Sequence, residues 1–215
     1  VYRVMHAYRH MRAYRRDIQA VCDSLVFNGQ DSVMTMYHDP ILWQEGQQLL
    51  GEEIKAFFND STIDSVQVLR QALSVERLDS IHYNQITGNE MHTYFRDGEV
   101  YLSTSIGNVY VNYFHMGEDS ILADMNRTET TFLKIFLKDR KVDKIWMPAA
   151  TGSFYPIPLI PADMLYVENF AWFDYVRPVD KHDIFEWRPK KAGSELKKIT
   201  RREAPKQKLS NIKKK

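Results

Sequence analysis

Hydrophobic and polar residues alternate along most of this chain, in short segments rich in Val, Ile, Tyr, Phe and Thr. The segments are separated by turn-forming pairs such as Asn28-Gly29 and Asp97-Gly98. Because side chains alternate between the two faces of a strand, this pattern predicts strands joined by turns. Helical spacing is limited to residues 66–78, which fit a strand equally well. We therefore expect an all-β protein.

Three segments repeat one pattern: Gly, two variable residues, a large apolar or aromatic residue, two variable residues, an aromatic residue and Phe. They begin at Gly51, Gly88 and Gly107. These starts are 37 and 19 residues apart, so the first interval is nearly twice the second. A period near 19 residues suits a strand, a turn and a returning strand, stacked as rungs. The repeat predicts an elongated, incomplete β-jelly roll with a solenoid-like stack of rungs.

A second pair of segments carries an Asp-Ser step inside an apolar alternation. Cys22-Asp-Ser-Leu-Val-Phe-Asn28 matches Leu78-Asp-Ser-Ile-His-Tyr-Asn84. The apolar residues before and after the step are out of phase, and a bulge or corner brings both sets back to one face. We expect a corner at Asp23-Ser24 and another at Asp79-Ser80.

These repeats place a set of apolar residues on one shared inner face. The set is Leu25, Phe27, Ile54, Phe58, Ile81, Tyr83, Met91, Phe95, Tyr110 and Phe114. Glu53, Lys55, Glu90 and His92 belong to the opposite, exposed face. Two interpretations of the inner set remain open: it lines an apolar groove, or it fills the closed core of a sandwich.

Prolines distinguish the region from about residue 146 to 187, where they interrupt aromatic patches such as Phe170-Ala-Trp-Phe173. Prolines at this density exclude long central strands. We expect this region to form a terminal cap on the rungs of about 12–145, because the last rung otherwise leaves an unpaired edge. One or two strands are expected near 165–173, and residues 1–187 then form a single domain.

Charge is distributed unevenly, although the net charge of the chain is only +1. Residues 188–215 hold twelve Lys and Arg against two Glu, which leaves an acidic body and a basic C-terminal tail. Such tails bind anionic partners or are simply solvated. Peripheral membrane contact through the tail is one prediction, and no nucleic-acid partner is expected.

Catalytic and metal-binding patterns are weak. The single cysteine, Cys22, alternates with Ala20 on an apolar face and fits a small buried hydrophobe better than a nucleophile. The histidines are scattered, and the chain contains no phosphate-binding loop or nucleophile elbow. We expect no enzyme activity, no metal and no cofactor. No apolar run has the roughly 18 residues that a membrane-spanning helix needs.

Three runs of the sequence carry a family resemblance. They are Cys22-Asp-Ser-Leu-Val-Phe-Asn28, Met36-Tyr-His-Asp-Pro-Ile-Leu-Trp43 and Gly51-Glu-Glu-Ile-Lys-Ala-Phe-Phe-Asn-Asp60. In their order they resemble the OstA-like branch of the periplasmic lipopolysaccharide-transport proteins, which includes the LptA family and the amino-terminal domain of LptD. The match covers roughly residues 12–145, and the chain departs from compact family members at residues 61–73 and in its basic tail.

The resemblance implies a non-catalytic lipid-binding protein whose open jelly roll shelters the lipid A acyl chains of lipopolysaccharide. It implies a place in the periplasm of a Gram-negative cell, with outer-membrane association, in outer-membrane biogenesis. Expected partners are other lipopolysaccharide-transport proteins, or a second copy, joined end to end by strand pairing. The alternative is a β-solenoid carbohydrate-binding or adhesion module with a closed dry core, using exposed aromatics such as Trp43 and Trp172.

Overall fold

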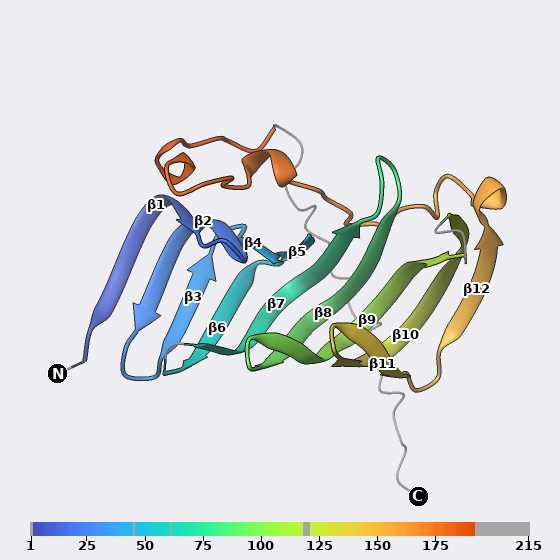
Figure 1. Cartoon of the computed structure of the whole chain (residues 1–215), viewed down its shortest axis with the longest axis horizontal. Coiled ribbons are helices and arrows are strands. Elements are labelled where there is room, and N and C mark those ends of the chain that lie inside the picture. The colour runs from blue at the N-terminus through green and yellow to red at the C-terminus, as the bar shows by residue number, and fades with distance from the viewer. Residues whose placement is uncertain (1, 45, 61, 118–120, 192–215) are drawn as a thin grey trace, which may run out of the picture.

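A computed structural model describes residues 2–44, 46–60, 62–117 and 121–191. These residues form one sheet of twelve strands, all paired antiparallel (Figure 1). The strands are β1 (Val4–Tyr14), β2 (Ile18–Asn28), β3 (Val33–Tyr37), β4 (Ile41–Gln44), β5 (Gln47–Leu50), β6 (Glu53–Asn59), β7 (Thr62–Arg77), β8 (Tyr83–Arg96), β9 (Glu99–Met116), β10 (Leu122–Lys138), β11 (Lys141–Trp146) and β12 (Thr151–Pro156). Three short 3-10 turns follow: η1 (Ile157–Leu159), η2 (Asp174–Val176) and η3 (Asp183–Phe185).

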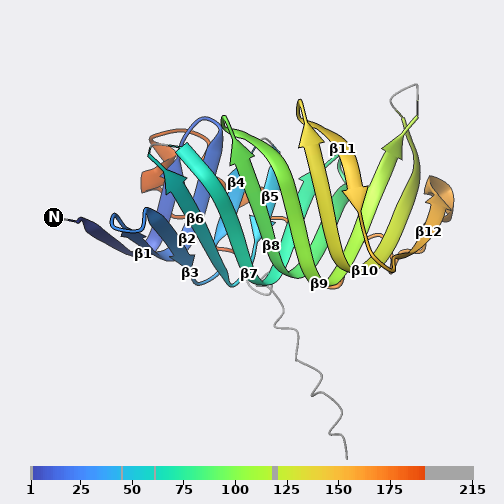
Figure 2. The same ribbon diagram turned by 90° about the horizontal axis from the view of Figure 1, so that it is seen from below.

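The sheet folds over on itself into two layers, because the long strands bend near their middle (Figure 2). The first half of β7 pairs with β6, and its second half pairs with β5. The long strands, β1, β2, β7, β8, β9 and β10, contribute one half to each layer. Layer A contains β3, β6 and β11 together with the adjoining halves of the long strands. Layer B contains β4, β5 and β12 together with the other halves. The predicted fold class, an all-β elongated jelly roll of stacked rungs, is confirmed. Residues 66–78, which fitted helix or strand, belong to β7 apart from the last one.

Strands cross between the layers in two alternating ways. In β1, β7 and β9, two successive residues adopt positive φ at the corner, namely Arg9-His10, Arg70-Gln71 and Gly107-Asn108. Each pair inserts extra chain relative to its neighbour, and the register shifts there. The neighbouring strands β2 and β8 change layer without such a pair. In these two strands, the inward-facing side chains lie at alternate positions on both sides of the crossing, but the alternation shifts by one residue at the crossing itself.

The corner predicted at Asp23-Ser24 illustrates the second way. Ala20 and Cys22 before it, and Leu25 and Phe27 after it, all pack into the same core cluster. The partner strand of β2 changes at this point from β4 to β3. The sequence-based prediction of this corner is therefore confirmed.

The corner predicted at Asp79-Ser80 is wrong, because this segment is the turn between β7 and β8. The Asp79 Oδ1 atom accepts hydrogen bonds from the backbone N–H groups of Ile81, at 2.8 Å, and His82, at 2.7 Å. β7 has already changed layer at Arg70-Gln71, so Asp79 ends the strand instead of bending it.

The space between the layers is filled at the β1–β8 end by one apolar core, here called the inner cluster. Its buried members are Ala20, Cys22, Leu25, Met36, Leu42, Ile54, Ala56, Val66, Val68, Ala72, Met91 and Phe95. Phe27, Phe58, Ile86 and Val100 are among the partly buried residues packed against it. Because these residues come from both layers, the cluster holds the two layers together at this end.

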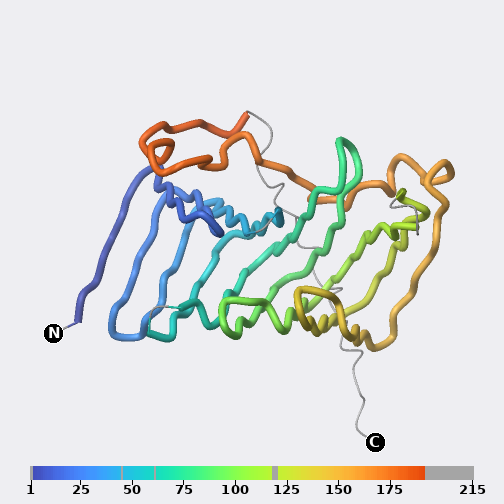
Figure 3. The backbone as a smooth tube through the Cα atoms, in the orientation of Figure 1, coloured from blue at the N-terminus to red at the C-terminus, as the bar shows by residue number. Residues whose placement is uncertain are grey.

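Residues 157–191, here called the strap, run back from β12 toward β1 along the outer face of layer B (Figure 3). They cover a second apolar core, the outer cluster, which consists of Val21, Ile41, Trp43, Leu50, Leu73, Val75, Tyr83, Val167, Phe173 and Val176. Within the proline-rich region of about 146–187, residues 151–156 form the strand β12 at the end of the sheet, and the residues from 157 on cover a face of the sheet, where a cap on the end of the stack was expected. The strands expected near 165–173 are absent from this described segment. The strap follows this course because the part of layer B formed by β2, β4, β5, β7 and β8 carries apolar side chains on both faces.

A row of side chains across layer B includes several that form hydrogen bonds with the backbone of the strap. Directly opposed neighbours in this row are Gln19, Trp43, Gln48, Val75, Gln85, Asn112 and Arg127. The Gln48 amide donates to the Ala171 carbonyl at 2.9 Å and accepts from the Phe173 N–H at 2.7 Å. Gln85 does the same with Leu165 and Val167, at 2.9 Å each. Both glutamines are fully buried, so they supply the hydrogen bonds that the extended strap cannot obtain from a neighbouring strand.

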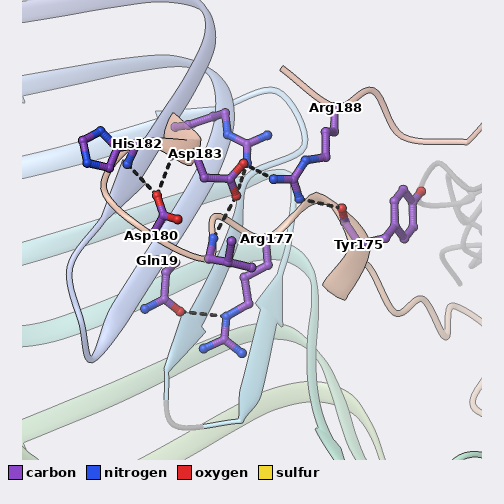
Figure 4. A network of polar contacts seen from close by, with 9 residues as sticks. Gln19, Tyr175, Arg177, Asp180, His182, Asp183 and Arg188 are labelled. Carbon is purple, nitrogen blue, oxygen red and sulfur yellow. Dashed lines mark hydrogen bonds and ion pairs between the residues drawn. The ribbon is translucent and has the colours of Figure 1, made fainter. Parts of the chain in front are cut away.

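The far end of the strap is fixed to β1 by a buried ion pair network (Figure 4). Asp183 of η3 accepts from Arg12 of β1 at 3.4 Å and also from Arg188. The Arg12 and Asp183 side chains are 1% and 6% exposed. Nearby, the Trp187 ring stacks on His10 with a centroid distance of 4.0 Å. The strap is therefore held both along its length and at its far end.

Candidate ligand-binding site

Six of the ten predicted groove residues do come together on the inner face. Leu25, Ile54, Met91 and Phe95 belong to the inner cluster, and Phe27 and Phe58 pack against it. The last two rings meet edge to face, with centroids 6.2 Å apart. The expected outward residues Glu53 and Lys55 form an ion pair on the opposite face of β6. At this end the layers therefore fill the interior with their own side chains.

The other four predicted residues lie elsewhere. Tyr83 and Tyr110 face the strap, where the Tyr83 and Phe170 rings lie 5.1 Å apart. Phe114 is buried against His82 on this same outer side, with ring centroids 5.1 Å apart. Ile81 is 52% exposed in the turn between β7 and β8.

The direction of chain crossing explains the outward position of Tyr110 and Phe114. After Gly51 and Gly88 the chain enters layer A, whereas after Gly107 it enters layer B. Residues at equivalent positions of the repeat therefore face inward in the first two repeats and outward in the third.

The inner face changes character at the β9–β12 end, where apolar side chains that point between the layers are exposed. On β11, Val142 pairs with Leu137 and Ile145 with Ile135, and both β11 residues are 51% exposed. In layer B, Tyr113 is 44% exposed and Phe154 is 67% exposed. We call Val142, Ile145, Tyr113 and Phe154 the open inner face. None of these four residues was among the sequence-based candidates.

The two layers present different chemistry at this end. Layer A offers apolar side chains, among them Leu133, Ile135, Leu137, Val142 and Ile145. Layer B offers Tyr113, His115, Asp124, Asn126, Thr128 and Phe154. Among the described strand residues of β9–β12, none that the register places on the inner face is Lys or Arg. The arrangement suits an amphipathic molecule with its apolar part toward layer A.

The single cysteine of the chain, Cys22, is buried in the inner cluster. Burial, with a contribution from Asp23, raises the pKa of the Cys22 thiol to about 12, which suppresses the nucleophilic thiolate. This agrees with the prediction of a buried small hydrophobe. Within the described part of the chain, no group of three or more His, Cys, Asp or Glu side chains is arranged to hold a metal ion. A search of the same part finds no helix with the length and apolarity to cross a membrane.

A pocket of about 310 Å³ lies where the strap passes the turn between β1 and β2, and it was not predicted from the sequence. Its lining includes Gln19, Asp174 and Arg177. The Arg177 guanidinium donates to Gln19 Oε1 at 2.8 Å and lies 3.8 Å from Asp174 Oδ1. These contacts already engage the charge of Arg177 in fixing the strap.

The structure is similar to that of LptH, the LptA homologous periplasmic component of the conserved lipopolysaccharide transport device from Pseudomonas aeruginosa, with a TM-score of 0.46 and 12% sequence identity. The match covers 64% of this chain and 93% of that chain. No protein-family model and no curated protein matches the sequence. A similarity at this level does not by itself assign a function.

Proposed function

We propose that this chain is a non-catalytic carrier that shelters the acyl chains of lipopolysaccharide between its two layers and helps to carry the lipid across the periplasm to the outer membrane. The observation that supports it most is the open inner face, where four large apolar side chains point between the layers and stay exposed. The proposal also rests on the resemblance of residues 12–145 to the OstA-like branch.

The energetics of such a site follow from apolar burial. Each acyl methylene group that leaves water contributes about 0.8 kcal/mol. A chain laid along Ile145, Val142 and Leu137 of layer A would cover side chains that are otherwise exposed or half-buried. We propose that the acyl chains enter here and continue toward Phe58, Phe95 and the rest of the inner cluster.

The edges of the sheet provide the proposed route for assembly. β1 lies at one edge, and its Val4 and Met5 are 55% and 53% exposed. A strand with an unpaired edge can receive a strand from another molecule. We propose that other lipopolysaccharide-transport proteins, or a second copy, join at β1 or at the β11–β12 end.

The basic tail adds a proposed peripheral contact with anionic membrane. Its first residues, up to Lys191, belong to the strap, and residues 192–215 lie outside the described residues. The cations of this segment suit lipid phosphates, to which clustered Lys and Arg are attracted.

The alternative function, a carbohydrate-binding or adhesion module, was suggested on the basis of Trp43 and Trp172, and the positions of these two residues do not support it. Trp43 is fully buried in the outer cluster, and Trp172 packs against that cluster. Neither ring forms an exposed platform. The packed inner cluster is the feature that still favours a closed core for the β1–β8 end.

Ile145 and Trp146 provide a matched test of the carrier function. These neighbours on β11 are 51% and 48% exposed but point to opposite faces. We expect Ile145→Glu to weaken binding of purified lipopolysaccharide at least about tenfold, because a carboxylate in an acyl site must lose its hydration. Trp146→Glu should leave binding unchanged. Equal effects of the two substitutions, with both variants folded by circular dichroism, would argue against the carrier.

A further inference from the structure

Two rows of side chains cross the inner face of layer B at its open end. Tyr113 of β9, Asn126 of β10 and Phe154 of β12 are directly opposed neighbours. The next row contains His115 of β9 and Asp124 of β10. Directly opposed side chains on one face of a sheet are close enough to touch a single small ligand together.

The contacts within this group fix its polar atoms. The His115 Nδ1 atom lies 2.7 Å from Asp124 Oδ1, and the imidazole packs edge to face on Tyr113 at 5.0 Å and stacks on Phe154 at 6.0 Å. When Nδ1 carries the proton it donates to Asp124, and Nε2 becomes an acceptor. The Asn126 Oδ1 atom accepts from Thr128 at 2.6 Å, which orients the Asn126 amide.

The group combines two kinds of recognition. Tyr113 and Phe154 offer ring surfaces that are 44% and 67% exposed at the level of the whole residue. The electron-rich face of an aromatic ring attracts the slightly positive C–H bonds of an apolar molecular face. Beside them, His115, Asp124 and Asn126 offer planar donors and acceptors for hydroxyl or amide groups.

The charges at this site exclude other ligand classes. The described inner-facing positions of β9, β10 and β12 include no Lys or Arg to bind phosphate. A single carboxylate with one imidazole is also too few ligands for a metal site, in agreement with the search of the described residues. An uncharged molecule with an apolar C–H face and several hydroxyl groups fits best, and a pyranose ring has both features.

We infer that Tyr113, His115, Asp124, Asn126 and Phe154 form a binding site for a sugar ring. The ring stacks against Phe154 and Tyr113, and its hydroxyl groups reach the polar side chains. Where the ligand is a glycolipid, which rests on the proposed function, the site holds its saccharide head group against layer B while the acyl chains lie against layer A. The bound lipid would then have a defined orientation between the two layers.

Titration of the full chain with chitobiose, cellobiose and maltose, followed by NMR, tests the site. We expect at least one of these disaccharides to shift signals of residues on β9, β10 and β12 in a saturable manner. Phe154→Ala should raise its dissociation constant about tenfold, and His115→Ala should do the same. Trp146→Ala, which removes an exposed aromatic ring from the outer face, should have no effect. Absence of binding to all three disaccharides would overturn the inference, as would equal loss in all three variants.

A second titration, with the fatty acid myristate, separates this inference from the carrier function. We expect Ile145→Glu to weaken myristate binding and leave the disaccharide unaffected, and His115→Ala to do the reverse. Myristate binding without any disaccharide binding refutes the sugar site and leaves the carrier in place. Disaccharide binding that depends on Phe154, without binding of myristate or lipopolysaccharide, supports the sugar site and refutes the carrier.

Discussion

Arg12 shows how a single buried charge shapes the attachment of the strap. Burial, and to a lesser extent Arg188, lowers the pKa of the Arg12 guanidinium. Its Nε and Nη1 atoms have no hydrogen-bond partner among the described residues. Asp183 forms an ion pair with Arg12 and is shared with Arg188, and Glu186 adds a further negative charge nearby. The sequence places Arg12 on a strand but contains no sign of its partner, which lies 171 residues away.

Replacing Asp183 should therefore destabilise the fold. We expect Asp183→Ala to lower the free energy of unfolding by about 3 kcal/mol, because it removes the carboxylate that is hydrogen-bonded to the buried Arg12. Urea unfolding followed by tryptophan fluorescence measures this. Arg12→Met combined with Asp183→Ala should recover part of the loss. A double variant less stable than Asp183→Ala alone would contradict this account of the pair.

Asp79 provides a test at low pH. Burial raises the pKa of its carboxyl, but the hydrogen bonds from His82 and from the backbone N–H groups of Ile81 and His82 outweigh it and lower the pKa to about 2. Because the folded pKa is below the unfolded one, this stabilisation is complete above about pH 4 and is lost as the pH falls toward 2. An NMR titration should find the Asp79 midpoint near 2. A midpoint near 4 would show that the turn does not stabilise the carboxylate.

At the level of elements, the sequence predicted the strands and the first corner because both depend on local alternation. The third repeat was misassigned because alternation does not record which layer the chain is entering. Gly51 and Gly107 look alike in the sequence, yet they serve different geometries. A Cβ on Gly51 would come within 2.4 Å of Val68 Cγ1, whereas Gly107 has a φ of +73° and begins a two-residue corner.

The strap could not be predicted for a related reason. Gln48 and Gln85 look like ordinary polar residues in an alternating strand, and their role depends on a segment far along the chain. Each one hydrogen-bonds a carbonyl and an N–H that are two residues apart in the strap. Buried polar groups that lose such partners cost about 1–3 kcal/mol each.

Loss of these glutamines should loosen the strap before the sheet. We expect Gln48→Ala combined with Gln85→Ala to speed hydrogen exchange of the backbone amides in residues 164–176, measured by mass spectrometry. Gln47→Ala is the control, since Gln47 is exposed and adjacent to Gln48 on β5. Unchanged exchange in the double variant would show that apolar packing alone holds the strap.

For the whole molecule, composition and repeats predicted one long domain of stacked rungs but not the distance between its layers. Alternation identified Ile54 as an inner-facing residue, whereas Ile145 was not among the sequence-based candidates, although the register of β11 places it on the inner face too. Only the fold shows that Ile54 is fully buried in the inner cluster while Ile145 is half exposed. A core that is packed at one end and open at the other is the feature on which the proposed carrier function rests.

Photo-crosslinking can show whether the acyl chains lie between the two layers. A photoreactive amino acid is placed at inner positions Phe58, Phe95 and Ile145, and at outer positions on the same strands, Lys55, His92 and Trp146. Each variant is irradiated with labelled lipopolysaccharide. We expect crosslinks from the inner positions, strongest at Ile145, and none from the outer positions. Crosslinks confined to Lys55, His92 or Trp146 would contradict it.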